Sequence, residues 1–300
     1  MSTEALGAVL PLKLRGGYHS ENLPRCRILF SSLIAFAEPD LLKEIHVVTP
    51  PDDCDDARRL CAEWPSLPLR VFDERDYLPV LRRRWFARGM YIQQLIKLTA
   101  ANRLDTPFFL TLDPDVILCK PLRKSDLFVD GRALLDPEPR RARPEWWTGS
   151  AGVLGIPVDL QADGMMLTPA LLSRTVCQQL FQHLEQRHSA DWDASLLRLT
   201  RRDWTEYALY HLIAEHTGLL AQVHAVTGRG MAKRLMCPTA VWAEFQFERW
   251  NLAECFDRAK PGFFTLVQSN TRSAPDAIRE RLAGYLEIRS REESGAPSRI

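Results

Sequence analysis

The sequence lacks the features that mark several large classes of protein. Lys and Arg total 39 and Asp and Glu total 38, so no excess charge of one sign favours nucleic acid or an anionic membrane. The seven cysteines are an odd number without a C-x-x-C pair, which argues against a disulfide scaffold or zinc site and favours a reducing compartment. No apolar run approaches the roughly 18 residues of a membrane span, and the N-terminus makes a poor signal peptide. We therefore expect a cytoplasmic protein without nucleic-acid partners or a transmembrane segment, while peripheral membrane association stays open.

Two common phosphate-binding motifs are also absent. The first predicted strand is followed by Gly16-Gly17 but not by G-x-G-x-x-G, and the loop G-x-x-x-x-G-K-[ST] occurs nowhere. A phosphate-binding function therefore has to rest on acidic and basic side chains elsewhere in the chain.

Strand and helix patterns alternate from the start of the chain, which predicts an α/β protein with a parallel, doubly wound sheet. Apolar runs predict strands at 8–12, 44–49, 69–72, 108–112, 116–119, 133–135, 165–168 and 262–270. Helical spacing and terminal signals predict helices at 23–36, 52–64, 88–104, 169–186, 203–217 and 275–286, before a flexible tail at 289–300.

One stretch joins a buried strand to two aspartates. The run from Phe108 to Leu112 is dense enough for the inside of a sheet, and Asp113 and Asp115 follow it, separated by one proline. Two such carboxylates repel each other unless a cation lies between them. Mg²⁺ and Mn²⁺ prefer oxygen ligands and often share them with substrate phosphates. The pattern predicts a divalent-metal site at the edge where open α/β sheets bind ligands.

Three polar side chains share one face of the helix that leads into this strand. Gln93, Gln94 and Lys97 are neighbours on that helix because positions three and four apart lie together. A lysine and two amides can reach a diphosphate or a sugar, but the same stripe also suits a solvated helix face.

Two later motifs each allow a functional and a structural interpretation. Trp146 and Trp147 can offer flat rings to the apolar side of a pyranose, or can simply be core material. Glu206 can act as a general base facing an acceptor, or can form a reciprocal helix cap with Asp203, three residues earlier.

The order of these motifs resembles a known enzyme class. Gln93-Gln94-x-x-Lys97, a strand running into Asp113-Pro-Asp115 and a Lys-Pro exit resemble nucleotide-sugar glycosyltransferases of the GT-A fold, over about residues 8–285. The segment 163–168 and Thr205-Glu206-Tyr207-x-x-Tyr210 resemble, more narrowly, bacterial glycosyltransferase-like proteins tied to polysaccharide biosynthesis.

The resemblance implies a single GT-A-like domain at 1–288, a Rossmann-type mixed sheet flanked by helices, with a nucleotide-sugar half at 1–125 and an acceptor half at 126–288. It implies metal-assisted transfer of a sugar from a nucleotide-diphosphate donor to a glycan or other hydroxyl acceptor. Together with the residue patterns above, the expected roles are donor binding by Gln93, Gln94, Lys97 and Asp113, binding of Mn²⁺ or Mg²⁺ by Asp113 and Asp115, acceptor binding by Trp146, Trp147 and Tyr207, and catalysis by Glu206.

The sequence departs from this pattern at the third metal ligand. Many metal-dependent members supply a late histidine, whereas the last histidine here is His224, which leaves Gln268 or Asn270 as substitutes. Two alternatives therefore stay open: a catalytically inactive nucleotide- or sugar-binding module of the same fold, and a sugar nucleotidyltransferase on a related fold.

Overall fold

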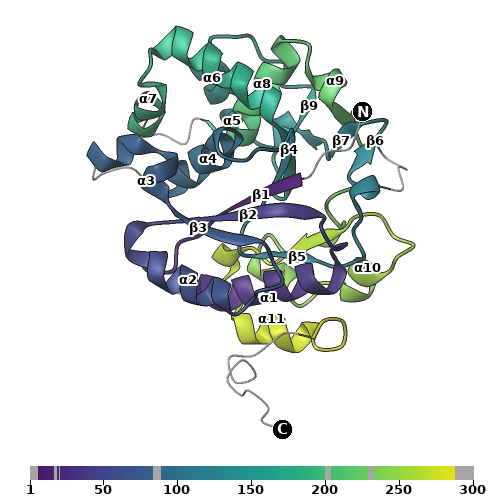
Figure 1. Ribbon diagram of the computed structural model, residues 1–300. Helices are drawn as coiled ribbons and strands as arrows, with labels where there is room; N and C mark the ends of the chain where they lie inside the picture. Colours follow the sequence, from purple (N-terminus) through teal and green to yellow (C-terminus); the bar gives the residue numbers. More distant parts are fainter. Residues whose placement is uncertain are drawn as a thin grey trace.

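A five-stranded sheet forms the centre of the molecule. The computed structural model describes residues 6–16, 19, 21–83, 89–199, 204–228 and 233–287. The strand order is β10-β4-β1-β2-β3 (Figure 1), where β1 to β4 are parallel and β10 runs antiparallel to β4. The bounds are β1 Leu6–Pro11, β2 Leu42–Thr49, β3 Leu69–Asp73, β4 Phe108–Thr111 and β10 Ala170–Ser173. The predicted mixed, Rossmann-type sheet is confirmed.

Helices cover both faces of this sheet (Figure 1). One face carries α1 Asn22–Phe36, α2 Cys54–Ala62 and α11 Pro275–Leu282. The other face carries α3 Glu74–Tyr77, α4 Gly89–Thr99, α5 Pro144–Leu154, α6 Arg174–His188, α7 Trp192–Arg198, α8 Glu206–His216 and α9 Leu220–Val223.

Smaller strand pairs complete the C-terminal half. β5 Val116–Leu118 pairs with β12 Phe264–Leu266, and β8 Glu138–Pro139 pairs with β9 Asp163–Gly164. A three-stranded sheet has β7 Arg132–Leu135 in its centre, between β6 Phe128–Val129 and β11 His224–Val226. The short helix α10 spans Leu252–Phe256. Within the described ranges, every helix is too short or too polar to cross a bilayer.

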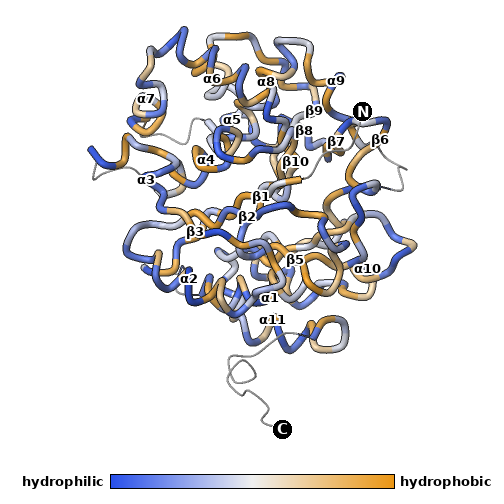
Figure 2. The backbone as a smooth tube through the Cα atoms, viewed as in Figure 1, coloured by the Kyte–Doolittle hydropathy of each residue, from blue (hydrophilic) through white to orange (hydrophobic). Residues whose placement is uncertain are grey.

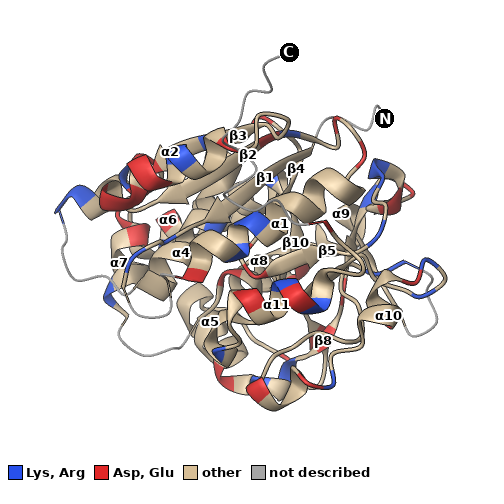
Figure 3. Cartoon of the chain, turned by 90° about the horizontal axis from the view of Figure 1, so that it is seen from below, with Lys and Arg blue, Asp and Glu red and all other residues tan. Residues whose placement is uncertain are grey.

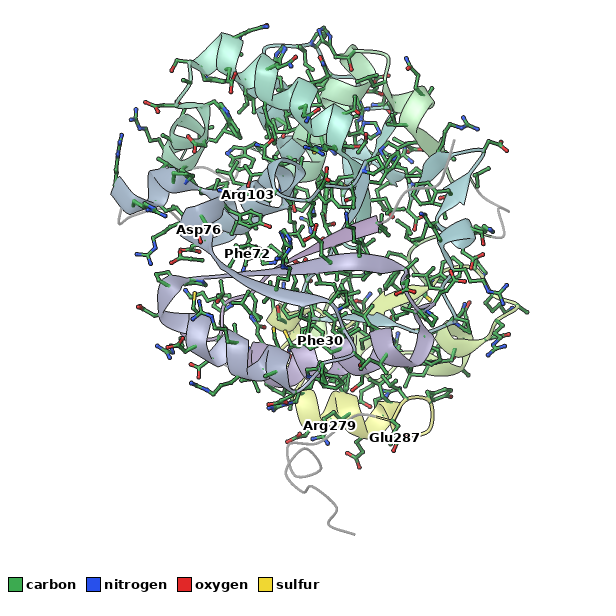
Figure 4. All side chains as sticks on the ribbon, viewed as in Figure 1. Phe30, Phe72, Asp76, Arg103, Arg279 and Glu287 are labelled. Atoms are coloured by element: carbon green, nitrogen blue, oxygen red, sulfur yellow. The ribbon has the colours of Figure 1, made fainter. Side chains whose placement is uncertain are left out.

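The core lies on both sides of the sheet because successive strand residues point to opposite faces. In β1, Val9 packs into the cluster above the sheet, whereas Ala8 and Leu10 pack into the cluster below it. Phe30 of α1 lies in the lower cluster and Phe72 of β3 packs against the upper one (Figure 4). Apolar strands are thus enclosed by helices whose outer faces are hydrophilic (Figure 2).

The outer helix faces carry charges of both signs side by side, on α2 and α11 in particular (Figure 3). Arg58 pairs with Asp55 and Arg59 with Asp56 on α2, and Arg279 pairs with Asp276 on α11. Exposed i,i+3 pairs of this kind stabilise a helix only slightly. They make these faces solvated surfaces without a dominant sign.

Two predicted elements near residue 168 are wrong. No strand forms at 165–168, and the helix expected from Pro169 begins instead at Arg174. Residues 170–173 form β10, which pairs with β4 and is fully buried. A short, fully buried apolar run has the same composition in a strand as at the start of a helix, so periodicity could not separate them.

Five helices of the described residues, α3, α5, α7, α9 and α10, were not predicted, and some predictions fall outside the described residues. α5 begins at Pro144, where no element was predicted; proline is well tolerated in the first helical turn. α7 also lacked a clear periodic signal. Arg88 and the tail at 289–300 lie outside the described ranges.

Candidate functional site

The site lies where the chain order of the sheet reverses. β1 is flanked by β2 on one side and by β4 on the other, and all three strands are parallel. In open α/β sheets the crevice beyond the carboxyl ends of strands at such a point is where ligands bind. Asp113 lies just beyond β4, and the backbone N–H of Leu112 still pairs with Val9 O at 2.8 Å. The first aspartate is therefore held at the rim of the sheet.

Lys97 of α4 joins two carboxylates that are far apart in the sequence. Its ammonium lies 3.0 and 3.1 Å from the two oxygens of Asp113 and 3.3 Å from Glu206 Oε1. Lys97 and Glu206 are buried, whereas the Asp113 side chain is 31% exposed. Burial works against the charged ammonium, but Asp113, Tyr207 and Glu206 outweigh it and raise the pKa of Lys97. The site thus holds a charged lysine between one open and one enclosed carboxylate.

Tyr207 and two threonines form the wall behind this lysine. The Tyr207 hydroxyl lies 2.8 Å from Thr111 Oγ1 and 2.7 Å from Thr168 Oγ1, and Lys97 Nζ donates to Thr168 Oγ1 at 3.1 Å. The Lys97 ammonium also lies 5.4 Å from the centre of the Tyr207 ring. Tyr207, predicted to bind an acceptor, is buried and supports Lys97 instead of facing solvent.

Glu206 is the first residue of α8. Thr205 caps this helix, since its hydroxyl oxygen accepts from the Ala208 N–H at 3.2 Å. The residue that caps α8 is therefore Thr205, and the Glu206 side chain contacts Lys97. Asp203 lies outside the described residues. Burial raises the pKa of Glu206, with Asp113 adding to the shift and Lys97 opposing it. A carboxylate so placed is a better proton acceptor than one in water.

Asp115 is held by the end of the last strand. Beyond β12, the Ser269 N–H donates to Asp115 Oδ2 at 2.9 Å, so the end of the 262–270 segment lies against the aspartate pair. Arg25 fixes this turn by donating to the carbonyls of Val267 and Ser273 at 2.7 and 2.8 Å. Burial, and then the Asp113 charge, raises the pKa of Asp115 to about 6. Asp115 therefore has a neighbour that repels its charge, as expected for a cation-binding pair.

The aspartate pair fits a divalent cation that takes further ligands from its substrate. Among the described residues, no group of three His, Cys, Asp or Glu side chains is placed to hold a metal ion. Mg²⁺ is commonly bound by one or two carboxylates together with water and phosphate oxygens, so two aspartates suffice as the protein's share. Gln268 directly precedes Ser269 and is half-buried, which puts the predicted third ligand in the turn that holds Asp115.

The remaining predicted residues divide between site and core. Trp147 is fully buried, with Arg140 stacked 4.7 Å from its ring centre and Gly164 packed against its edge. Its role as a sugar platform is therefore wrong, and the core interpretation holds. Trp146 is half-buried, like Gln93 and Gln94.

Gln94 differs from Gln93 in one respect that bears on ligand binding. Its Oε1 atom is buried and has no hydrogen-bond partner within the described structure. An unpaired buried acceptor costs free energy unless a ligand or water supplies a donor. Gln94 lies one helical turn before Lys97, so its unpaired acceptor oxygen lies on the same face of α4 as the lysine.

A family model matches residues 3–290 and is described as a family of unknown function (DUF6492). The chain belongs to DUF6492. No curated protein matches the DUF6492 chain. Its fold is shared by mouse xyloside xylosyltransferase 1 in the apo form, at 16% identity, a TM-score of 0.51 and coverage of 89% of this chain and 99% of that one. It is also shared by galactosyltransferase LgtC in complex with donor and acceptor sugar analogs, at 14% identity, a TM-score of 0.51 and coverage of 97% and 99%.

These likenesses show that the DUF6492 chain has the GT-A glycosyltransferase fold, as its motifs predicted.

Sequence reasoning missed Arg25, Thr111, Thr168 and Ser269, which orient the site through hydrogen bonds. Thr168 alone had a signal, since it ends the 163–168 segment that carries the narrower resemblance.

Proposed function

We propose that this DUF6492 protein is a glycosyltransferase that moves a sugar from a nucleotide-diphosphate donor to a hydroxyl of a glycan or similar acceptor. The observation that carries the proposal is the convergence of Lys97, Asp113 and Glu206 at the switch point of a GT-A sheet. These groups come from α4, the end of β4 and α8, and they supply both signs of charge at one place. A buried cluster of oppositely charged groups at a ligand-binding crevice supports a chemical role.

On the donor side, Asp113 and Asp115 would hold Mn²⁺ or Mg²⁺ with Gln268 nearby, and Lys97 and Gln94 would face the diphosphate or its sugar. A bound divalent cation neutralises negative charge developing on a leaving diphosphate. Lys97 adds a fixed positive charge that is already oriented by Thr168 and Tyr207. Gln93 lies on the same helix, half-buried, and completes the proposed donor contacts.

On the acceptor side, Glu206 would take the proton of the attacking hydroxyl. The acceptor oxygen forms a bond to the anomeric carbon, the bond from that carbon to the diphosphate oxygen breaks, and the hydroxyl proton passes to the Glu206 carboxylate. Burial raises the pKa of Glu206, which makes its carboxylate a stronger base than one in water. If the reaction retains the anomeric configuration, Glu206 instead holds the acceptor hydroxyl. We place the nucleotide-sugar half at 1–125 and the acceptor half at 126–288, within one domain.

The second candidate is a catalytically inactive binding module of the same fold. It is favoured by the lack of a third His, Cys, Asp or Glu ligand among the described residues. A module would bind nucleotide or sugar without releasing a nucleoside diphosphate, so the two candidates separate on turnover alone.

Calorimetric titration of UDP, GDP and CDP, with and without Mn²⁺, tests the donor site. We expect at least one nucleotide to bind wild type in a Mn²⁺-dependent manner, and Asp115→Ala to lose that binding. The matched control is Asp276→Ala, because Asp276 is 92% exposed on α11. It should bind like wild type.

Two outcomes would contradict the donor site. One is binding that is equally tight in wild type and Asp115→Ala. The other is the absence of binding by wild type to all three nucleotides. Thermal unfolding of each variant distinguishes lost binding from lost folding.

A further inference from the structure

An exposed aromatic turn lies next to the strand segment that holds Asp115. Trp242 and Phe245 have exposed fractions of 37% and 72%, the latter the largest among the exposed large hydrophobic residues of the described chain. They are three residues apart: Trp242 lies just before the 3₁₀ turn η7 (Glu244–Gln246), and Phe245 lies within it. Apolar residues that are exposed singly need no explanation, but two aromatic rings on one short turn indicate a binding surface.

The turn is firmly built although its aromatic rings face solvent. Gln246 Oε1 accepts from the backbone N–H groups of Trp242 and Ala243 at 2.8 and 2.9 Å. At the far end, Arg281 of α11 donates to the carbonyl oxygens of Phe247 and Trp250 and lies over both of their rings. A turn fixed at both ends presents its two aromatic side chains at little further entropic cost on binding.

Hydrogen bonds connect this turn to the candidate site. The Val241 N–H donates to Leu266 O, and the Gln268 N–H donates back to Val241 O, both at 2.9 Å. On the other side of the same segment, the Val267 N–H donates to Asp115 O at 3.3 Å. Val241 and Asp115 are thus two strand spacings apart, about 10 Å at roughly 4.8 Å each. Trp242, the next residue, therefore begins the aromatic turn at about this backbone distance from Asp115, the proposed metal ligand.

We infer that Trp242 and Phe245 form a pyranose-binding platform for the acceptor of the proposed reaction. The inference rests on the proposed function and names its acceptor class: a sugar with a continuous apolar C–H face. Flat aromatic rings pack against such a face, and nearby polar groups bind its hydroxyls. Half-buried Gln268, whose N–H donates to Val241 O, provides an amide group next to the turn. The turn takes the role that the buried ring of Trp147 cannot fill.

Saturation-transfer NMR tests the platform with methyl glucopyranoside, methyl galactopyranoside, methyl mannopyranoside, lactose and maltose as probes. We expect at least one probe to bind wild type through its ring C–H protons. Trp242→Ala/Phe245→Ala should weaken that binding by about tenfold, from the loss of two aromatic contacts. Tyr285→Ala is the matched control, because Tyr285 is 41% exposed beyond the end of α11 and stacks on Phe256 instead of lying on the aromatic turn. It should leave probe binding unchanged.

Two further measurements keep the inference separate from the proposed function. Mn²⁺-dependent nucleotide binding should be the same in the double variant and wild type, since the aromatic turn holds no donor contact. If wild type binds a sugar probe but none of the nucleotides, the proposed glycosyltransferase function is rejected, whereas the sugar-binding platform is supported. Phe245→Ser alone, at a site 72% exposed, tests the platform if the double variant fails to fold.

The inference is overturned if no probe binds wild type, or if probes bind wild type and the variants equally. It is also overturned if the variants lose only their binding to phosphatidylglycerol vesicles, because the turn would then be a membrane contact.

Discussion

Replacing Lys97 with methionine removes the one ammonium that joins Asp113 to Glu206. The contacts of 3.0 to 3.3 Å are short, and Lys97 and Glu206 side chains are each only 7% exposed. Breaking a buried ion pair by removing one partner costs about 3–5 kcal/mol. Because the Asp113 side chain is 31% exposed and water screens its charge, we expect the lower end, about 3 kcal/mol.

This cost converts to a shift in melting temperature. At roughly 2.1 cal/mol/K per residue, unfolding of 300 residues has an entropy of about 0.6 kcal/mol/K, so Lys97→Met should lower Tm by about 5 °C. Differential scanning calorimetry of wild type and Lys97→Met measures this decrease in Tm. Arg82→Met is the control, because Arg82 pairs with Asp76 at 3.1 Å with side chains 63% and 47% exposed. That surface pair contributes about 0–1 kcal/mol, less than 2 °C.

A double-mutant cycle isolates the interaction itself. Lys97→Met/Glu206→Gln should be less destabilised than the sum of the single variants, by about 1–3 kcal/mol, because the second change removes the carboxylate that the first leaves unpaired. A Tm for Lys97→Met no lower than that of Arg82→Met, or strictly additive single effects, would refute this reasoning.

Two other predictions concern residues outside the site. Burial lowers the pKa of His224 to about 4, so acid favours the unfolded chain, which binds the proton below pH 6.5 while the folded chain does not. Wild type should therefore lose about 2 kcal/mol relative to His224→Gln between pH 7 and pH 5 in urea unfolding, and a constant difference between the two would contradict this. Gly262→Ala should cost more than about 1 kcal/mol in urea unfolding, since Gly262 has φ +89° and a Cβ there would lie 2.5 Å from the Cys237 backbone. Gly284→Ala, where a Cβ meets nothing within 4 Å, is its control, and equal unfolding midpoints would reject the steric reason.

The N-terminal half of the fold was predictable from the sequence because each element there has a pattern of its own. Strands β1, β2 and β3 are separated by the helices α1 and α2, and turns such as Pro50-Pro51 mark the strand ends. The C-terminal half was harder because its strands have only two to four residues, too few for periodicity to show. Antiparallel β10 could be recognised only from its pairing with β4.

The site was predictable as residue types but not as contacts. The strand before Asp113 and the helix face with Lys97 could be read locally, but their meeting with Glu206 depends on how α8 packs against α4. The same limit explains Trp147, whose neighbours Arg140 and Gly164 become visible only when the chain is folded. Composition cannot tell a buried tryptophan from an exposed one, since both roles use the same large ring.

Release of nucleoside diphosphate from nucleotide-sugars tests the central claim most directly. Wild type and Glu206→Gln are incubated with UDP-, GDP- and CDP-sugars, Mn²⁺ and the methyl glycosides and disaccharides named above. We predict release by wild type with at least one donor, and release at least about 100-fold slower by Glu206→Gln, the usual effect of losing a general base. No release by wild type with any donor, or equal release by both proteins, would contradict a glycosyltransferase that works through Glu206.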